Sequence, residues 1–253
     1  RYAPGNVLRY GTNTTPGTTD MTTAIQASIN QMVKKGFAGV APVYIPSGNY
    51  KVSSTLTYTP TSSDDGALIY GDGFGSIITS TVLAPNSLLK CVNQRGITIE
   101  QLQFVGPDEG GVTATSGHCI CLFDSAPFVG TFFPAHSVIR HLKITGFRGT
   151  DTQVTDTTSG VATDAAGIYV GPGLNNLVDQ CVVTLCANGV MFDESQNSHI
   201  SNTAISTCTK WGVLFDSVTD GHSVTGCDII ANGVDANGEA IFYVGATPLY
   251  YAG

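Results

Sequence analysis

Charged residues are scarce in the 253-residue sequence, and basic residues are the scarcer kind. Only 12% of the residues are charged, and 11 Lys and Arg stand against 19 Asp and Glu, which gives a formal net charge of −8. Nucleic-acid binding depends on clustered Lys and Arg that neutralise phosphates, so this composition argues against a nucleic-acid partner. The acidic balance itself needs no function beyond keeping the protein in solution.

Long apolar runs are also missing. No stretch approaches the roughly 20 apolar residues that span a bilayer, so we expect no insertion into a membrane. The sequence shows no secretory leader with a charged and then an apolar part. Because it begins with Arg1 rather than Met, we expect the chain to be truncated at one or both ends, and export from the cell stays open.

The cysteines do not form a recognisable metal or disulfide pattern. There are seven, an odd number that cannot pair completely. No Cys-x-x-Cys pair occurs and the histidine spacing does not complete a ligand set, so we predict no metal site and no cofactor. We expect reduced thiols that pack as small apolar side chains.

Stretches typical of helices are few, and short runs of Thr, Val, Ile and Gly take their place. With 42% hydrophobic residues and 30 glycines, the composition favours many short strands. One amphipathic helix is predicted near the start, with Thr19 or Asp20 as its cap. Its apolar residues recur at helical spacing: Ala24, Ile25, Ile29, Met32 and Val33. We expect this helix to cover the exposed end of a solenoid.

From about residue 93 the sequence becomes repetitive. Val178, Ile200 and Val224 recur every 22 to 24 residues, each within an alternation of apolar and polar positions. A fixed period in the twenties predicts a solenoid. The Leu-x-x-Leu-x-Leu pattern of leucine-rich repeats is absent. We therefore predict an all-β fold, a right-handed single-stranded parallel β-helix whose coils stack at the strand spacing of ~4.8 Å.

The repeats indicate one domain over residues 1–253. We expect an N-terminal strand and the capping helix over about 1–40, and coils over about 41–253. Two segments break the period, one near 107–136 with many Gly, Pro and Phe, and one near 149–166 with many Thr, Asp and Gly. Both are expected to project as loops, which is where binding residues concentrate on rigid scaffolds.

Four motifs in the first third of the chain occur in a recognisable order. They are RYG at 9–11, TDMTTAIQ at 19–26, VYIPSGNY at 43–50 and GDGFGS at 71–76. The glycine-rich motif lacks the following helix and the Lys of a phosphate-binding loop, so we interpret it as a tight turn between coils. Together the motifs resemble the N-terminal part of the pectate-lyase-like β-helix superfamily. They cover roughly residues 9–78, and the repeats extend the likeness over most of the chain.

The tail-spike branch of that superfamily contains phage proteins that depolymerise polysaccharides. The resemblance implies a tail-spike-like protein that binds, and as we predict hydrolyses, a bacterial surface polysaccharide. It also implies a homotrimer on a virion tail, joined to other tail proteins through a segment outside this chain; without a virus, a secreted protein would be expected. The superfamily also holds non-catalytic fibres and polysaccharide lyases, and both stay as alternatives.

Two acids in successive repeats are the candidates for catalysis. Asp193 and Asp216 each follow an apolar strand by one residue, and Glu194 is adjacent. Stacked coils would place their backbones ~5 Å apart, and a pair of carboxylates at ~5 Å or ~6.5–9.5 Å hydrolyses glycosidic bonds. Like charges at that distance raise one pKa, which suits an acid and base pair. The alternative is that both Asp side chains accept backbone hydrogen bonds at a turn.

Four further residues are candidates for binding the substrate. Trp211 could stack on a sugar ring, and Asp124 follows a strand-end pattern. Asp164 belongs to the Thr-rich segment and could bind hydroxyl groups, while Arg148 lies near other basic residues that a lyase would use. Core packing and surface solvation are the alternatives for these residues. No Gly-x-Ser-x-Gly motif exists, which argues against a serine hydrolase of that type.

Overall fold

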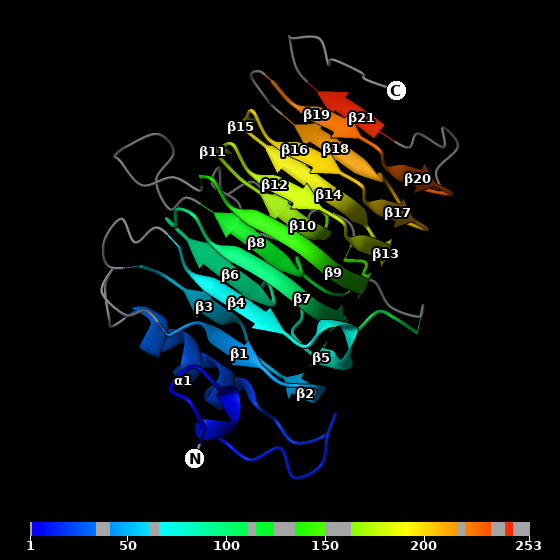
Figure 1. Cartoon of the computed structure of the whole chain (residues 1–253). Helices are drawn as coiled ribbons and strands as arrows, with labels where there is room; N and C mark the ends of the chain where they lie inside the picture. Colours follow the sequence, from blue (N-terminus) through cyan, green and yellow to red (C-terminus); the bar gives the residue numbers. More distant parts are fainter. Residues whose placement is uncertain are drawn as a thin grey trace.

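Short parallel strands that pair coil upon coil make up most of the computed structural model (Figure 1). The structure describes residues 2–33, 41–60, 66–110, 115–123, 135–149, 163–216, 221–233 and 241–244, the last with backbone only. All strand pairings recorded between these residues are parallel, and each strand pairs with one from the coil before or after it.

Sheet A contains two columns of strands that share the long strands β7 (Thr98–Val105) and β9 (Val138–Phe147). The other strands of column A1 are β1 (Val43–Ile45), β4 (Leu68–Gly71), β12 (Leu177–Asp179), β16 (His199–Ser201) and β19 (Ser223–Thr225). Those of column A2 are β2 (Gly48–Val52), β5 (Ser76–Ser80), β13 (Val182–Cys186), β17 (Ala204–Ser206) and β20 (Asp228–Ile230).

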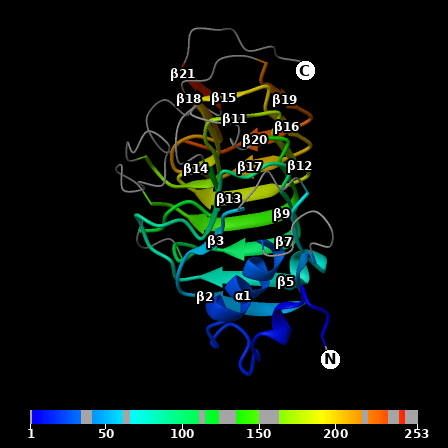
Figure 2. The same ribbon diagram turned by 90° about the vertical axis from the view of Figure 1, so that its left-hand side faces the viewer.

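Sheet B lies across the core from sheet A. Its strands, in spatial order, are β3 (Leu56–Tyr58), β6 (Leu89–Val92), β8 (Ile120–Phe123), β10 (Ala166–Val170), β14 (Asn188–Asp193), β18 (Val213–Asp216) and β21 (Ile241–Val244). A short ladder of β11 (Gly173–Leu174) and β15 (Ser195–Gln196) closes the corner between sheet B and column A1. The view in Figure 2, turned by 90°, shows the coils rising from the N-terminus.

The predicted register of the repeats is confirmed. Val178 pairs with Ile200, and Ile200 pairs with Val224. Val178 and Ile200 are fully buried and Val224 packs against the same core. In sheet B, Phe192 and Phe215 stack with ring centroids 5.3 Å apart. Each coil therefore contributes inward side chains that rest on those of its neighbours, as expected when backbones stack in register.

The predicted helix is present as α1 (Thr22–Val33) at the N-terminal end. Its first turn is held by Asp20, whose Oδ1 accepts a hydrogen bond from the Thr22 amide at 2.9 Å. Ile25, Ile29 and Met32 are buried in the core. The helix packs against β1, β3 and the 3-10 turn η1 (Val7–Arg9), so it lies on the first strands of both sheets, the position expected of a cap (Figures 1 and 2).

The segment near 107–136, expected to project as a loop, contains a strand in its described part. Residues 120–123 form β8, in which Ile120 pairs with Leu89 on one side and Ile168 on the other. The sheet requires this strand because its backbone groups bridge the coils below and above. Of the segment near 149–166, residues 163–165 lead directly into β10. Residues 150–162 lie outside the described part.

The cysteines are free thiols, as predicted. Six are buried and Cys227 is partly exposed. Burial raises the pKa of Cys91, Cys181 and Cys208 to about 12, so these thiols stay protonated and behave as small apolar groups. In the described part of the chain, no helix has both the length and the apolar character that crossing a membrane requires.

Candidate functional site

The two candidate catalytic acids lie side by side at the ends of β14 and β18. Asp193 pairs with Asp216 in the parallel ladder, as the repeats predicted. Side chains alternate along a strand. Because Phe192 and Phe215 point into the core, both acids point to the outer face of sheet B. Neighbouring backbones in a sheet are ~4.8 Å apart, so the carboxyl groups lie within reach of one small group.

Asp193 is held by a tyrosine from the preceding coil. The Tyr169 hydroxyl donates a hydrogen bond to Asp193 Oδ2 at 2.7 Å. Tyr169 is fully buried, and its ring stacks on His118 with centroids 4.6 Å apart. His118 is oriented in turn by the Ala166 amide, which donates to its Nδ1 at 2.9 Å. The orientation of the Asp193 carboxyl is therefore fixed by three successive contacts.

The outer face of sheet B is unusually apolar around this tyrosine. A second buried cluster lies there, separate from the core between the sheets: Cys121, Ala166, Tyr169 and Met191, with Phe123 and Leu214 packed against it. Asp193 follows Met191 on this face and is only 9% exposed. Its carboxyl group thus has low access to water, unlike an acid at an ordinary exposed turn.

Burial has a direct effect on the acidity of this group. Loss of hydration raises the pKa of Asp193 to about 6, and the negative charges of Asp216 and Glu194 act in the same direction. The hydrogen bond from Tyr169 opposes them by stabilising the carboxylate. Asp193 therefore keeps its proton to a higher pH than a solvated aspartic acid, which is the property a general acid requires.

Glu194 has a structural position at the turn that follows. Its backbone is left-handed, with φ +51°, and its amide donates to the Asp216 carbonyl at 3.0 Å. The residue is half-buried. The side chain contributes negative charge beside Asp193, while the backbone continues the ladder into the corner strand β15.

The predicted substrate-binding residues that the structure describes lie away from these acids. Trp211 pairs with the start of β14, where the Gly189 amide donates to its carbonyl at 2.9 Å. Asp164 forms an ion pair with Lys210 at 2.6 Å at the same corner. Asp193 is at the far end of the six-residue strand β14, which amounts to roughly 15 Å at the usual rise per residue. Asp124 lies outside the described residues.

Arg148 belongs to the corner of Trp211 and Asp164 as well. Its amide donates to the buried carboxylate of Asp108 at 3.1 Å. Several polar atoms here are buried without a hydrogen-bond partner: Arg148 Nε, Thr163 Oγ1, Asp164 Oδ1 and Thr209 Oγ1. Buried polar atoms in folded proteins are normally satisfied by protein, water or a ligand. This corner is thus a polar site distinct from the acid pair.

Sequence reasoning missed Tyr169 and His118. A signal for Tyr169 was present, since Gly167 to Val170 repeats the pattern of Gly189 to Phe192 one coil later. That alignment pairs Tyr169 with Met191, the residue two before Asp193 on the same face. His118 has no comparable signal, because the sequence between His118 and Tyr169 shows no regular repeat that would place the two residues side by side.

Comparison with known proteins supports the architecture. A family model described as the right handed beta helix region matches residues 65–250. The crystal structure of Dettilon tailspike protein (gp208) superimposes with a TM-score of 0.59 and 16% identity over 92% of this chain and 45% of that one. The structure of pre-mature bacteriophage phi29 gene product 12 gives 0.56 and 17% over 95% and 32%.

The coverage and the sequence identity of these structural matches determine what can be inferred from them. The chain spans less than half the length of either protein. Sequence identities of 16% and 17% support a shared fold but not a shared activity. No curated protein matches the sequence. The family model, in contrast, covers most of the chain and agrees with the parallel coils of the structure. The chain belongs to the right-handed β-helix family.

Proposed function

We propose that this chain is the β-helical part of a tail-spike-like protein that binds and hydrolyses a bacterial surface polysaccharide. The observation that carries the proposal is the in-register pair Asp193 and Asp216, one member of which has its pKa raised to about 6. Two matched carboxyl groups on a long, rigid outer face suit an extended glycan. The tailspike protein among the structural neighbours supports a tail-spike-like role.

The chemistry follows from the different surroundings of the two acids. Asp193, protonated, would donate its proton to the glycosidic oxygen as the bond to the anomeric carbon breaks. Asp216 would attack that carbon and form a glycosyl ester, which water then hydrolyses with Asp193 acting as base. Carboxyl groups on neighbouring strands are nearer to the ~5 Å of retaining enzymes than to the ~6.5–9.5 Å of inverting ones. Tyr169 acts as a positioning residue through its hydrogen bond.

Cleavage of purified polysaccharides tests the proposal. The protein is incubated with a panel of bacterial capsular and O-antigen polysaccharides, and both reducing ends and the ultraviolet absorbance of unsaturated uronates are followed. We expect reducing ends without new absorbance on at least one polysaccharide. Both signals together would indicate a lyase. Binding without either signal would indicate a non-catalytic fibre. The lyase outcome and the non-catalytic outcome would each contradict hydrolysis.

The pH dependence of cleavage should identify the acid. If Asp193 must be protonated, kcat/KM falls as the pH rises through about 6, the pKa that burial gives this group. Tyr169→Phe removes a hydrogen bond that lowers the pKa, so the alkaline limb is expected to move to higher pH. Tyr70→Phe, on the outer face of sheet A, is the matched control. An alkaline limb that stays in place or moves to lower pH would contradict the role of Tyr169.

A homotrimer on a virion tail belongs to the same proposal. The neighbours named as a tailspike and as a bacteriophage gene product support the place on a virion tail, and both are longer than this chain. The segment that joins other tail proteins is expected outside this chain. Light scattering of the full-length protein is the measurement, and a mass of three chains is the expected result.

A further inference from the structure

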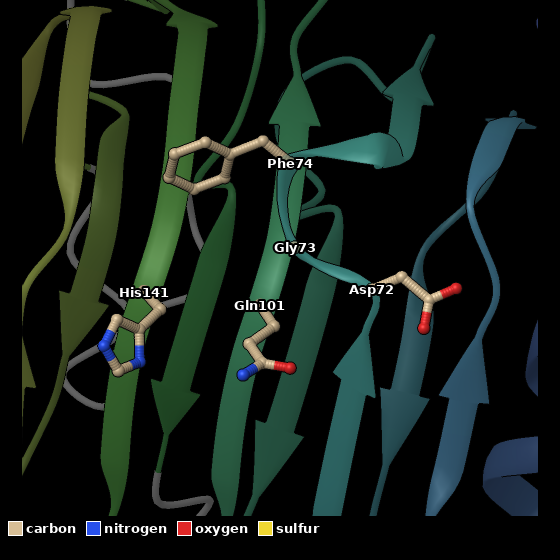
Figure 3. A pocket seen from close by; sticks show the side chains of 5 residues that line it. All are labelled: Asp72, Gly73, Phe74, Gln101 and His141. Atoms are coloured by element: carbon tan, nitrogen blue, oxygen red, sulfur yellow. The ribbon is translucent and has the colours of Figure 1, made fainter.

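A second site candidate lies on the outer surface of sheet A. There a pocket of about 320 Å³ is lined by Asp72, Gly73, Phe74, Gln101 and His141 (Figure 3). Small-molecule sites range from roughly 300 to 1,000 Å³, so this pocket has room for a group of modest size. It belongs to the bend between columns A1 and A2, on a different sheet from Asp193 and Asp216.

The wall that carries Phe74 is firmly held. It is the 3-10 turn η3 (Gly73–Gly75), which packs against β7 and β9. Both carboxylate oxygens of Asp72 accept the Tyr44 hydroxyl at 2.9 Å, and the Ser47 amide donates to Oδ2 at 2.9 Å. The Asp72 amide donates to Ser76 Oγ at 2.8 Å. A side chain on such a turn is positioned before a ligand arrives, which lowers the entropic cost of binding.

Phe74 is more exposed than the other phenylalanines whose side chains the structure describes. Its exposed fraction is 47%, whereas the other phenylalanine side chains that the structure describes are buried or half-buried. A single exposed apolar residue is ordinary on its own. Here the ring extends from η3 across β7 towards β9, on the side from which Gln101 and His141 project (Figure 3). The apolar ring of Phe74 therefore lies beside the hydrogen-bonding side chains of Gln101 and His141.

The polar groups come from neighbouring strands. Gln101 of β7 and His141 of β9 lie in register, between the pairs Glu100–Arg140 and Leu102–Leu142. The exposed amide of Gln101 both donates and accepts hydrogen bonds. His141 Nε2 pairs with Gln180 Oε1 at 2.6 Å, while its Nδ1 is buried without a partner. The pocket wall thus offers the donor and acceptor of the Gln101 amide beside the imidazole ring of His141.

The charge around the pocket selects against anions. Among the described residues that line it there is no Lys or Arg, and Asp72 contributes a carboxylate. Arg140, next to His141, is engaged by Glu100 at 2.6 Å. An acidic sugar would meet negative charge without a cation to balance it. A neutral sugar presents an apolar ring face to an aromatic plate and hydroxyl groups to amides and imidazoles.

We propose that this pocket binds one neutral pyranose residue of a surface polysaccharide, with Phe74 against the ring face and Gln101 and His141 at the hydroxyl groups. The site is separate from the acid pair and goes beyond the proposed hydrolysis. Binding here does not depend on cleavage, so the failure of one proposal leaves the other intact.

Saturation-transfer NMR with simple sugars tests the pocket. The probes are the methyl pyranosides of glucose, galactose, mannose, rhamnose and N-acetylglucosamine, with methyl glucuronide as the charged comparison. We expect at least one neutral probe to receive saturation through the ring protons of one face. Phe74→Ala should weaken its binding at least tenfold, and Phe74→Trp, which keeps an aromatic plate, should retain it.

The control for Phe74→Ala is Leu83→Ala. Leu83 is 51% exposed and lies outside the pocket, so its loss should leave binding unchanged. The proposal is overturned if no neutral probe is saturated, if methyl glucuronide binds more tightly than all of them, or if Phe74→Ala and Leu83→Ala bind equally well.

Discussion

Replacement of Asp193 by Asn is expected to lower kcat/KM for polysaccharide cleavage by about 10²–10⁴-fold, the usual contribution of a general acid. Asp216→Asn should cause a loss of at least that order, because it removes the carboxylate that would attack the anomeric carbon. Reducing-end assays on the polysaccharide identified by the panel measure both effects. Neither substitution should lower the melting temperature. In the Asp193→Asn variant the amide oxygen can still accept the hydrogen bond from Tyr169, and the new side chain carries no charge to desolvate.

A matched control for these acids is Asp228→Asn. Asp228 lies on β20 of sheet A with an exposed side chain, so its loss removes a carboxylate of the same type far from the pair. Its kcat/KM should equal that of the unmodified protein. Full activity in both Asp193→Asn and Asp216→Asn would remove the acid pair from the mechanism.

Replacement of Phe192 by Ala should destabilise the protein by about 3–5 kcal/mol, the range measured when buried aromatic residues are truncated. The side chain is fully buried, stacks on Phe215 at 5.3 Å and approaches the ring of His222 at 5.7 Å. Its removal leaves a cavity that spans two coils, and neither coil can close it without breaking the ladder. Denaturant unfolding followed by circular dichroism is the measurement.

Ile230→Ala provides the comparison for this effect. The Ile230 side chain is 56% exposed on β20, and surface substitutions usually stay within about 0.5 kcal/mol. Equal losses of stability in the two variants would mean that Phe192 is not part of a packed interior column.

The architecture could be predicted because one rule repeats along the chain. Val178, Ile200 and Val224 recur at nearly constant spacing, and stacking turns that spacing into a vertical column. The same rule brought Asp193 and Asp216 together. The glycine-rich motif is a turn, as predicted, but it joins β4 to β5 within one coil and does not lie between coils. Gly73 in this turn adopts a left-handed φ of +82°, where a side chain is disfavoured.

The rule fails where a strand is buried on both faces. In β8, β10 and β14 almost every residue is buried, inward and outward alike. Such strands lose the alternation of apolar and polar residues and resemble continuous apolar runs. This is why the pairing of β8 with the coils on both sides and the apolar surroundings of Asp193 were not foreseen.

The position of the substrate-binding candidates relative to the acids could not be predicted from the sequence. Trp211 and Asp216 are near one another in sequence. The extended strand β18 lies between them, so Trp211 precedes the start of the strand and Asp216 is at its end. Trp211, Asp164 and Arg148 were chosen as candidates by residue type, which gives no position relative to the acids. Position along the strand separates them from the acids.

The coils are stacked at a uniform spacing, so positions on different coils are separated by a fixed height. Phe74 and Asp193 are fixed on coils whose A1 strands are β4 and β12, three steps apart along the series β4, β7, β9 and β12. At ~4.8 Å a step, the two positions differ by roughly 14 Å in height. Insertion or loss of one whole repeat between them would change that height by one coil spacing and would leave each position locally intact, so the distance between the two positions can change only in whole steps.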